Sequence, residues 1–299
     1  MAFRIPLTFT AMMLIAPMAI ADDITIGTYA GDVTLSDTPD VVAVLDAAAI
    51  DTITALGVEV DAVPDMPPLD YLTEAMAEAE RVGSLFEPDF EALAALGPDL
   101  IIAGGRSSRQ VAPLSEIAPT VDMTIWGDDL IGQTHARLAA YGEIFDRAAQ
   151  AEALSRMLNT RLTEAAAAVE GQGNALILLA NGGNVSAYGD DSRFGWLHTA
   201  IGLPEAFEAL SAETHGEAVS FEFIADVNPD WILVIDRAAA IGQNGEAAAA
   251  TLDNPLVAST TAAQTGQILY LDSGPLYLAG GGVQSMMMTL DEVIEGFGG

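Results

Sequence analysis

The chain has 299 residues, no cysteine, and 43 acidic residues against ten basic ones, all of them arginines, for a formal net charge of −33. The lack of cysteine excludes disulfides, zinc–thiolate sites and a cysteine nucleophile, and the charge repels nucleic acid and anionic membranes. The length suffices for two lobes of ordinary domain size.

Residues 1–21 have the features of an export signal. Arg4 is their only charge, an apolar run covers 7–20, and a small–x–small cleavage sequence stands at 19–21 before two aspartates. An uncleaved anchor is the alternative, although the apolar run is short for a bilayer and contains Pro17. Without a cysteine to carry a lipid, the mature protein is expected to be free in a periplasm.

Residues 22–128 are predicted to form a first lobe in which strands and helices alternate. Asp89 can cap a helix, and the prolines of 64–68 indicate a loop. The predicted strands are 24–28, 58–60 and 100–103, and the predicted helices are 46–56, 71–80 and 90–96. This alternation indicates a mainly parallel sheet that is covered on both faces.

Residues 129–170 are predicted to form one connecting helix. The segment is rich in Ala, Leu, Glu and Arg, and Gly132 and Gly142 are its only glycines. A helix of roughly 40 residues would be about 60 Å long, which is more than one lobe needs. We therefore expect a long spine helix that joins two lobes.

Residues 171–299 are predicted to form the second lobe. The predicted strands are 175–180, 185–188, 230–235 and 267–271, and the predicted helices are one from a Ser192 cap to 201, 221–227 and 284–295. The expected fold class is therefore α/β, with two lobes that each contain a mainly parallel sheet flanked by helices. No glycine pattern for a nucleotide is present.

One stretch occurs twice in the chain. Residues 90–106 read FEALAALGPDLIIAGGR, and residues 221–237 read FEFIADVNPDWILVIDR. The two copies align with each other without an insertion or deletion. A repeat of this length indicates one structural unit that is used twice, once in each lobe.

In each copy an arginine follows the carboxyl end of a predicted strand. Ligands of open α/β sheets bind outside these strand ends, so Arg106 and Arg237 are expected to face a shared cleft. Guanidinium groups are always charged and suit anionic oxygens. The alternative is that both arginines are structural and pair with nearby acids.

The repeat also places Glu91 and Glu222 in the first turns of their helices. The helix dipole alone favours an acid there, which is one explanation. The other is that two equivalent acids, one on each lobe and away from the arginines, dock onto a partner with two equivalent basic sockets.

The three histidines do not form a metal site by their spacing. His135 lies on the predicted spine and His198 in a predicted helix, so both are expected to be surface or packing residues. His215 lies in a loop beside a glycine and is the better ligand candidate. No zinc-site spacing and no nucleophile elbow occurs, so nothing in the chain demands an enzyme.

Several segments together resemble the siderophore-binding proteins of ABC iron importers, a class with a rigid helical backbone that also binds cobalamin and haem. The segments are 82–106 (VGSLFEPDFEALAALGPDLIIAGGR), 114–120 (LSEIAPT), 184–198 (NVSAYGDDSRFGWLH), 214–216 (THG), 234–237 (VIDR), 252–263 (LDNPLVASTTAA) and 270–282 (YLDSGPLYLAGGG). The SAYG-x-x-SRFG and THG motifs resemble the catecholate-type subgroup, which includes petrobactin and enterobactin-fragment receptors.

The resemblance implies roles for individual residues. It implies that Arg106, Arg193 and Arg237 bind the anionic ferric catecholate. It implies that His215 and Tyr277 bind the iron directly when the siderophore supplies only four donors, and both are suitable ligands for iron(III). The family often has further aromatic residues before this tyrosine, where this chain has Ser-Gly-Pro-Leu.

The resemblance also implies that Glu91 and Glu222 dock onto arginines of the permease. The partners expected are thus a ferric siderophore and an inner-membrane ABC permease with its ATPase.

These features predict a monomeric periplasmic solute-binding protein that captures a ferric catecholate-type siderophore and delivers it to the permease. Iron(III) is then part of the ligand, and no intrinsic cofactor is expected. The alternatives are a haem or cobalamin carrier of the same class, an enzyme or chelatase component on the same scaffold, and a structural surface protein.

Overall fold

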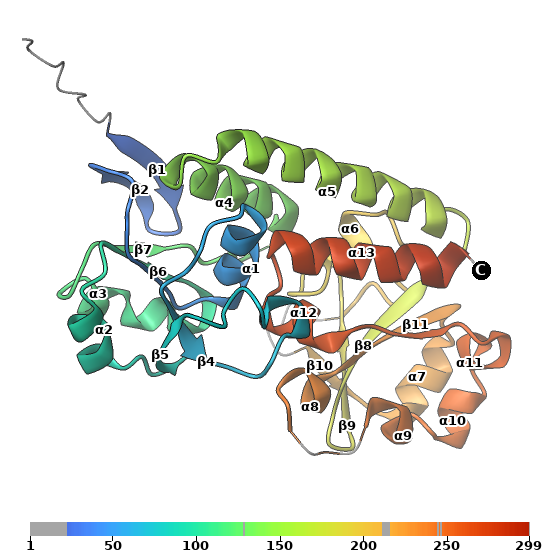
Figure 1. Cartoon of the computed structure of the whole chain (residues 1–299). Coiled ribbons are helices and arrows are strands. Elements are labelled where there is room, and N and C mark those ends of the chain that lie inside the picture. Colours follow the sequence, from blue (N-terminus) through green and yellow to red (C-terminus); the bar gives the residue numbers. More distant parts are fainter. Residues whose placement is uncertain (1–22, 128, 211–215, 244, 246, 299) are drawn as a thin grey trace, which may run out of the picture.

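The computed structural model describes residues 23–127, 129–210, 216–243, 245 and 247–298. The predicted signal peptide lies outside these residues. The chain forms two lobes that lie beneath a pair of long helices, α5 and α13 (Figure 1).

The first lobe is built on a five-stranded parallel sheet with the order β5-β4-β3-β6-β7. Its strands are β3 (Val42–Val44), β4 (Ala62–Asp65), β5 (Glu80–Ser84), β6 (Leu100–Ala103) and β7 (Thr120–Asp122). Its helices are α1 (Ala47–Ala55), η1 (Asp70–Leu72), α2 (Phe90–Leu96), η2 (Gly105–Gln110) and α3 (Val111–Leu114), and a separate hairpin joins β1 (Ile24–Thr28) to β2 (Gly31–Leu35).

Both faces of this sheet are buried, as the sequence predicted. Along β6, Leu100 and Ile102 pack into one hydrophobic cluster, while Ile101 and Ala103 pack into another on the opposite face. We call the edge at which the parallel strands end the carboxyl edge of the sheet.

Two elements predicted for this lobe are wrong. Residues 58–60 form no strand, and the strand instead lies at β4, which includes Pro64 of the predicted loop. Residues 71–80 form no continuous helix, because after η1 the chain proceeds through turns that hydrogen-bond Ala77 N to Glu74 O and Ala79 N to Met76 O. Leu72 and Met76 are buried at helical spacing, which explains the misleading pattern.

The predicted spine helix of residues 129–170 is two helices. α4 (Leu130–Ile144) and α5 (Ala148–Val169) lie side by side, since His135 contacts both Ser155 and Asn159. α4 ends in a Schellman motif: Asp146 has a positive φ of 52°, and Arg147 N donates to Gly142 O at 2.7 Å. Asp occupies the position that usually holds Gly, so no obvious stop signal is visible in the sequence.

The second lobe contains a five-stranded mixed sheet with the order β10-β9-β8-β11-β12. β8, β11 and β12 are parallel, whereas β9 is antiparallel to both β8 and β10. The strands are β8 (Ala175–Asn181), β9 (Asn184–Tyr188), β10 (Glu217–Val219), β11 (Trp231–Asp236) and β12 (Ile268–Tyr270). The helices are α6 (Trp196–Thr199), α7 (Phe221–Val227), α8 (Arg237–Ala240), α9 (Ala248–Thr251), α10 (Pro255–Ala258), α11 (Thr261–Thr265), α12 (Ser273–Leu278) and α13 (Val283–Gly298).

The helix predicted from Ser192 to residue 201 is reduced to α6. The hydroxyl of Ser192 bonds to Gly189 O in a tight turn, in which a side chain at Gly195 would collide with Asp190 O. The last helix, α13, also departs from the predicted lobe boundary of 171–299, because it packs against α5 and against α1 of the first lobe.

The sequence repeat is one structural unit that occurs in both lobes. α2 and α7 begin and end at equivalent residues, and both end in a left-handed residue, Gly97 with φ 65° and Asn228 with φ 48°. Strands β6 and β11 follow at the same spacing. Within the described residues, no helix has the length and apolar character needed to cross a membrane.

Candidate functional site

The repeat places an arginine just past the carboxyl edge of each sheet. Arg106 lies in η2, directly after β6, and Arg237 is the first residue of α8, directly after β11. The turn before Arg106 is tight, because Gly105 has a φ of +50° and a side chain at Gly104 would press on Asp46 and Thr124.

Three arginines converge on Tyr277 of α12. Arg106 of the first lobe donates to the backbone oxygens of Tyr277 (3.0 Å) and Leu278 (3.1 Å), and Arg193 donates to the same Tyr277 oxygen at 2.8 Å. Arg237 donates to the Tyr277 hydroxyl at 3.2 Å. The guanidinium carbon of Arg193 lies 4.5 Å from the centre of the tyrosine ring, and that of Arg106 lies 5.5 Å from it.

Among the described residues, these arginines bond to neutral acceptors and to no acid. The side chain of Asn181 accepts a further bond from Arg237 at 3.3 Å. Among the described residues, the ion pairs within 4.0 Å involve only Arg156 and Arg161, which lie on α5. The described residues therefore do not support the alternative, in which the site arginines pair with local acids.

The clustering of positive charge changes the acidity of the groups in it. Burial lowers the pKa of Arg193, and the nearby charge of Arg106 lowers it further. Burial alone would raise the pKa of Tyr277, but the Arg237 hydrogen bond and the charges of Arg193, Arg237 and Arg106 outweigh burial, so its pKa lies below the usual 10. A bound anion would relieve the repulsion between the cations.

Tyr188 and Asn181 also belong to the site, and the sequence analysis did not single them out. Tyr188 packs edge-on against Phe194 at 4.8 Å, and burial raises its pKa to about 12. Asn181 is the last residue of β8, which pairs with β11. Ligands of open α/β sheets bind outside such strand ends, and this rule, which located Arg106 and Arg237, could also have located Asn181.

The histidines of the described regions are packing residues, as predicted. His135 bonds to Ser155 and Asn159, and buried His198 bonds to Leu203 O through Nδ1. His215 lies outside the described residues. Its neighbour Gly216 is described: it has a φ of +70° and leaves no room for a side chain against Tyr188. No group of three or more His, Asp or Glu residues suited to a metal occurs in the part of the chain that the structure describes.

The expected position of Glu91 and Glu222, away from the arginines, is wrong. A helix that follows a parallel strand runs back across the sheet, so its first turn lies at the carboxyl edge. α2 begins after β5, and Asp89 N donates to Val82 O of that strand at 2.9 Å. α7 begins after β10. Val219 of β10 pairs with Val185 of β9, which in turn pairs with the end of β8. Both glutamates are exposed and share the carboxyl edges with Arg106 and Arg237.

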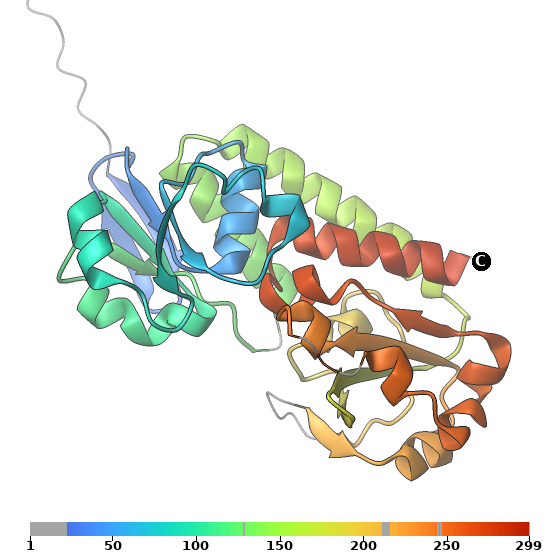
Figure 2. The ribbon, with the colours of Figure 1, turned by 60° about the horizontal axis from the view of Figure 1, so that its bottom comes forward.

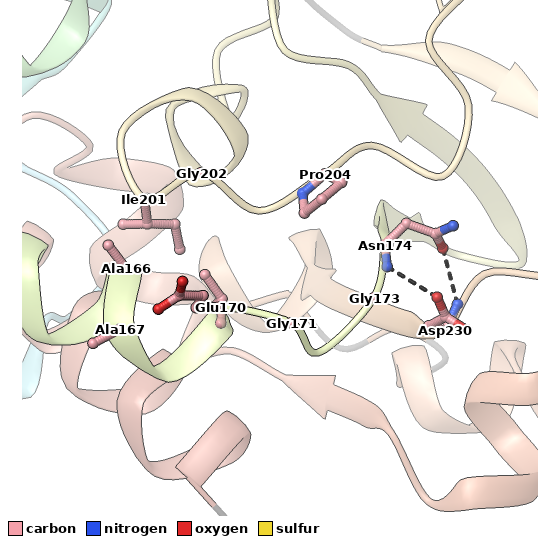
Figure 3. A pocket seen from close by; sticks show the side chains of 11 residues that line it. Ala166, Ala167, Glu170, Gly171, Gly173, Asn174, Ile201, Gly202, Pro204 and Asp230 are labelled. Carbon is pink, nitrogen blue, oxygen red and sulfur yellow. Dashed lines mark hydrogen bonds between the residues drawn. The ribbon is translucent and has the colours of Figure 1, made fainter.

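A separate hollow of about 840 Å³ lies at the other edge of the second sheet. Figure 3 shows it between the end of α5 and the residues that precede β8 and β11. Asn174 and Asp230 exchange two hydrogen bonds of 3.0 Å there, so their polar groups already have partners. None of the predicted site residues that the structure describes lines this hollow.

Known proteins match this chain over most of its length. A family model described as a periplasmic binding protein matches residues 42–275. Petrobactin-binding protein YclQ of Bacillus subtilis (strain 168) is 34% identical over 263 residues, which cover 86% of this chain and 82% of YclQ. Ferric-anguibactin-binding protein FatB of Vibrio anguillarum is 29% identical over 278 residues, which cover 89% and 85%.

Solved structures give the same result. The crystal structure of YclQ matches with a TM-score of 0.87 and 33% identity, covering 92% of this chain and 99% of that one. The periplasmic catecholate-siderophore binding protein VctP from Vibrio cholerae matches with a TM-score of 0.84 and 30% identity, covering 91% and 99%.

These matches confirm the predicted two-lobed fold and the resemblance to siderophore-binding proteins. The relatives are binding proteins, so the expectation of a binding function instead of catalysis is also confirmed. The family model implies that the protein is exported. The chain belongs to the periplasmic binding protein family.

Proposed function

We propose that this protein captures a ferric catecholate-type siderophore between its two lobes and delivers it to an inner-membrane ABC permease. The names of the relatives support a siderophore as the ligand. The ligand that best fits the site is a multiply negative iron(III) chelate.

The observation that carries this proposal is the convergence of Arg106, Arg193 and Arg237 on Tyr277 without an acidic partner among the described residues. In a chain of such negative charge, three guanidinium groups around one ring are costly unless an anion binds there. Guanidinium groups form strong, directional bonds to anionic oxygens, such as those of catecholates.

Tyr277 and His215 are proposed as direct iron ligands when a siderophore supplies only four donors. The lowered pKa of Tyr277 supports this role, because the phenolate is the form that binds iron(III). Gly216 lies against the Tyr188 ring, and Tyr188 in turn contacts Phe194 beside Arg193. This places the residue next to His215 close to the arginine cluster.

Glu91 and Glu222 are proposed to bind basic residues of the permease. Their exposure at the carboxyl edge of each lobe supports this role, since a partner bound there would cover the arginine cluster. Its own backbone N–H and the Ser220 hydroxyl lower the pKa of Glu222, which keeps it charged. Residues 1–21 are proposed as the export signal that brings a monomeric protein to the periplasm.

A panel of ligands tests the function. The mature protein is titrated calorimetrically with a ferric tris-catecholate, a tetradentate ferric bis-catecholate, a neutral ferric tris-hydroxamate, haem and cobalamin. We expect tight binding of the two anionic catecholates and weak binding of the others. Preferential binding of haem, cobalamin or the neutral hydroxamate would contradict the proposal.

A further inference from the structure

Trp126 is an exposed aromatic side chain on a firmly held segment. Trp126 is 58% exposed, whereas Trp196 and Trp231 are buried. Within the described residues, the indole has no stacked ring, cation or hydrogen-bond acceptor as a partner. A single exposed aromatic side chain is common on protein surfaces, so its place beside the arginine cluster carries the argument.

The backbone around Trp126 is fixed by side chains of α4. The Gln133 amide accepts from Trp126 N at 3.0 Å and donates to Trp126 O at 2.7 Å. Buried Arg137 donates to Met123 O, to Thr124 O and, across to β1, to Gly27 O. Three carbonyl bonds to one guanidinium therefore tie the approach to Trp126 to α4 and to β1.

The same segment borders the arginine cluster. Gly105 N, adjacent to Arg106, donates to the Thr124 hydroxyl at 3.0 Å. Ile125 lies so close to Gly281 that a side chain there would collide with it, and Gly281 is three residues beyond Leu278, whose oxygen accepts from Arg106. In Figure 2 the green segment between β7 and α4 passes from the first lobe toward the junction of the lobes.

We propose that Trp126 is the platform on which an aromatic ring of the chelate stacks, and that it makes the site prefer aryl siderophores to non-aromatic anionic iron chelates. This inference rests on the proposed function. The arginines recognise negative charge, which a citrate chelate also has, whereas an indole face distinguishes a planar ring from an aliphatic arm. Aromatic stacking adds selectivity beyond the area it buries.

The test uses gallium(III) chelates, which have the charge and geometry of the iron chelates without quenching fluorescence. Acrylamide quenching of the free protein should show one accessible tryptophan, which Trp126→Phe removes. Saturation with a gallium tris-catecholate should protect that tryptophan from acrylamide. Trp126→Ala should weaken binding of this chelate about three- to tenfold, while Trp126→Phe retains most of it.

Gallium citrate and Met157→Ala serve as controls. Citrate affinity should not change in Trp126→Ala, and Met157→Ala, which removes an exposed apolar side chain on α5, should bind the catecholate normally. Undiminished acrylamide access in the catecholate complex, or an equal loss for citrate and catecholate in Trp126→Ala, would overturn the inference alone. Failure of the unmodified protein to bind any catecholate would overturn the proposed function as well.

Discussion

Tyr277 shows how strongly the pKa of a side chain depends on its surroundings in this protein. Its phenol accepts a hydrogen bond from Arg237 while two more guanidinium groups lie over or near its ring. Loss of contact with water raises the pKa values of the tyrosines at 71, 141, 188 and 270, and at Tyr141 and Tyr188 it outweighs the opposing effect of nearby arginines. Tyr277 is the one with a lowered pKa.

We predict that Tyr277 supplies the phenolate that forms at the lowest pH in the ligand-free protein. An acid with a lowered pKa loses its proton at a lower pH, so Tyr277→Phe should remove the earliest component of an ultraviolet phenolate titration. Arg237→Gln should shift that component to higher pH, since it removes the hydrogen bond that most favours the charged form. An earliest component that is unchanged in Tyr277→Phe would contradict this assignment.

The sequence predicted some residues of the candidate site and missed others for physical reasons. Arg106 and Arg237 could be found because the repeat places both after strand ends, and Arg193 and Tyr277 came from motif resemblance. Trp126 could not be found in this way, because the strand before it, β7, has only three residues and no distinct pattern. Asn181 had the same kind of signal as the arginines and was overlooked.

At the scale of elements, α2 and α7 give each lobe one exposed glutamate on the first turn of a short helix. The helix dipole and the exposed position keep each charge available to a cationic partner. The two glutamates lie on different lobes and share no contacts, so their effects should be independent.

We predict that Glu91→Gln and Glu222→Gln each weaken binding to the detergent-solubilised permease about tenfold, and that the double variant loses about the product. Affinity for the ferric chelate should stay unchanged, because neither carboxylate contacts the arginine cluster. Glu143→Gln, on the exposed face of α4, is the control. Normal permease binding by the double variant would rule out docking through these residues.

The elements themselves were predicted best where the pattern was local and complete. α2, α7 and β6 have the predicted bounds because a capping residue, an apolar core and a left-handed stop are all encoded within a few residues. The break between α4 and α5 was missed because Asp146 has the left-handed conformation at a position where Gly is usually found. The helix predicted at 71–80 was wrong although the buried residues there have helical spacing, because this segment forms the connection to β5.

At the scale of the whole molecule, the lobes are joined by two helices that lie side by side (Figures 1 and 2). α5 has 22 residues and is about 33 Å long. The first turn of α13 is bound to the first lobe by Asp51 of α1, whose carboxylate accepts from Gln284 N, Ser285 N and the Tyr71 hydroxyl at 2.7–2.8 Å. Burial raises the pKa of Asp51 to about 7.

This arrangement sets the distance between the arginines of the two lobes. A connection made of packed helices bends less than one made of extended strands, so Arg106 and Arg237 stay close without a ligand. Pattern analysis could not reveal the Asp51 contact, because it joins residues that are more than 200 positions apart and depends on the complete fold.

Calorimetric titration of arginine variants with a ferric tris-catecholate tests the central claim most directly. Arg106→Gln, Arg193→Gln and Arg237→Gln should each lower the affinity about tenfold or more, since each loses a charge-assisted bond, while Arg156→Gln on α5 should bind normally. Unchanged affinity in all three folded variants would contradict the account.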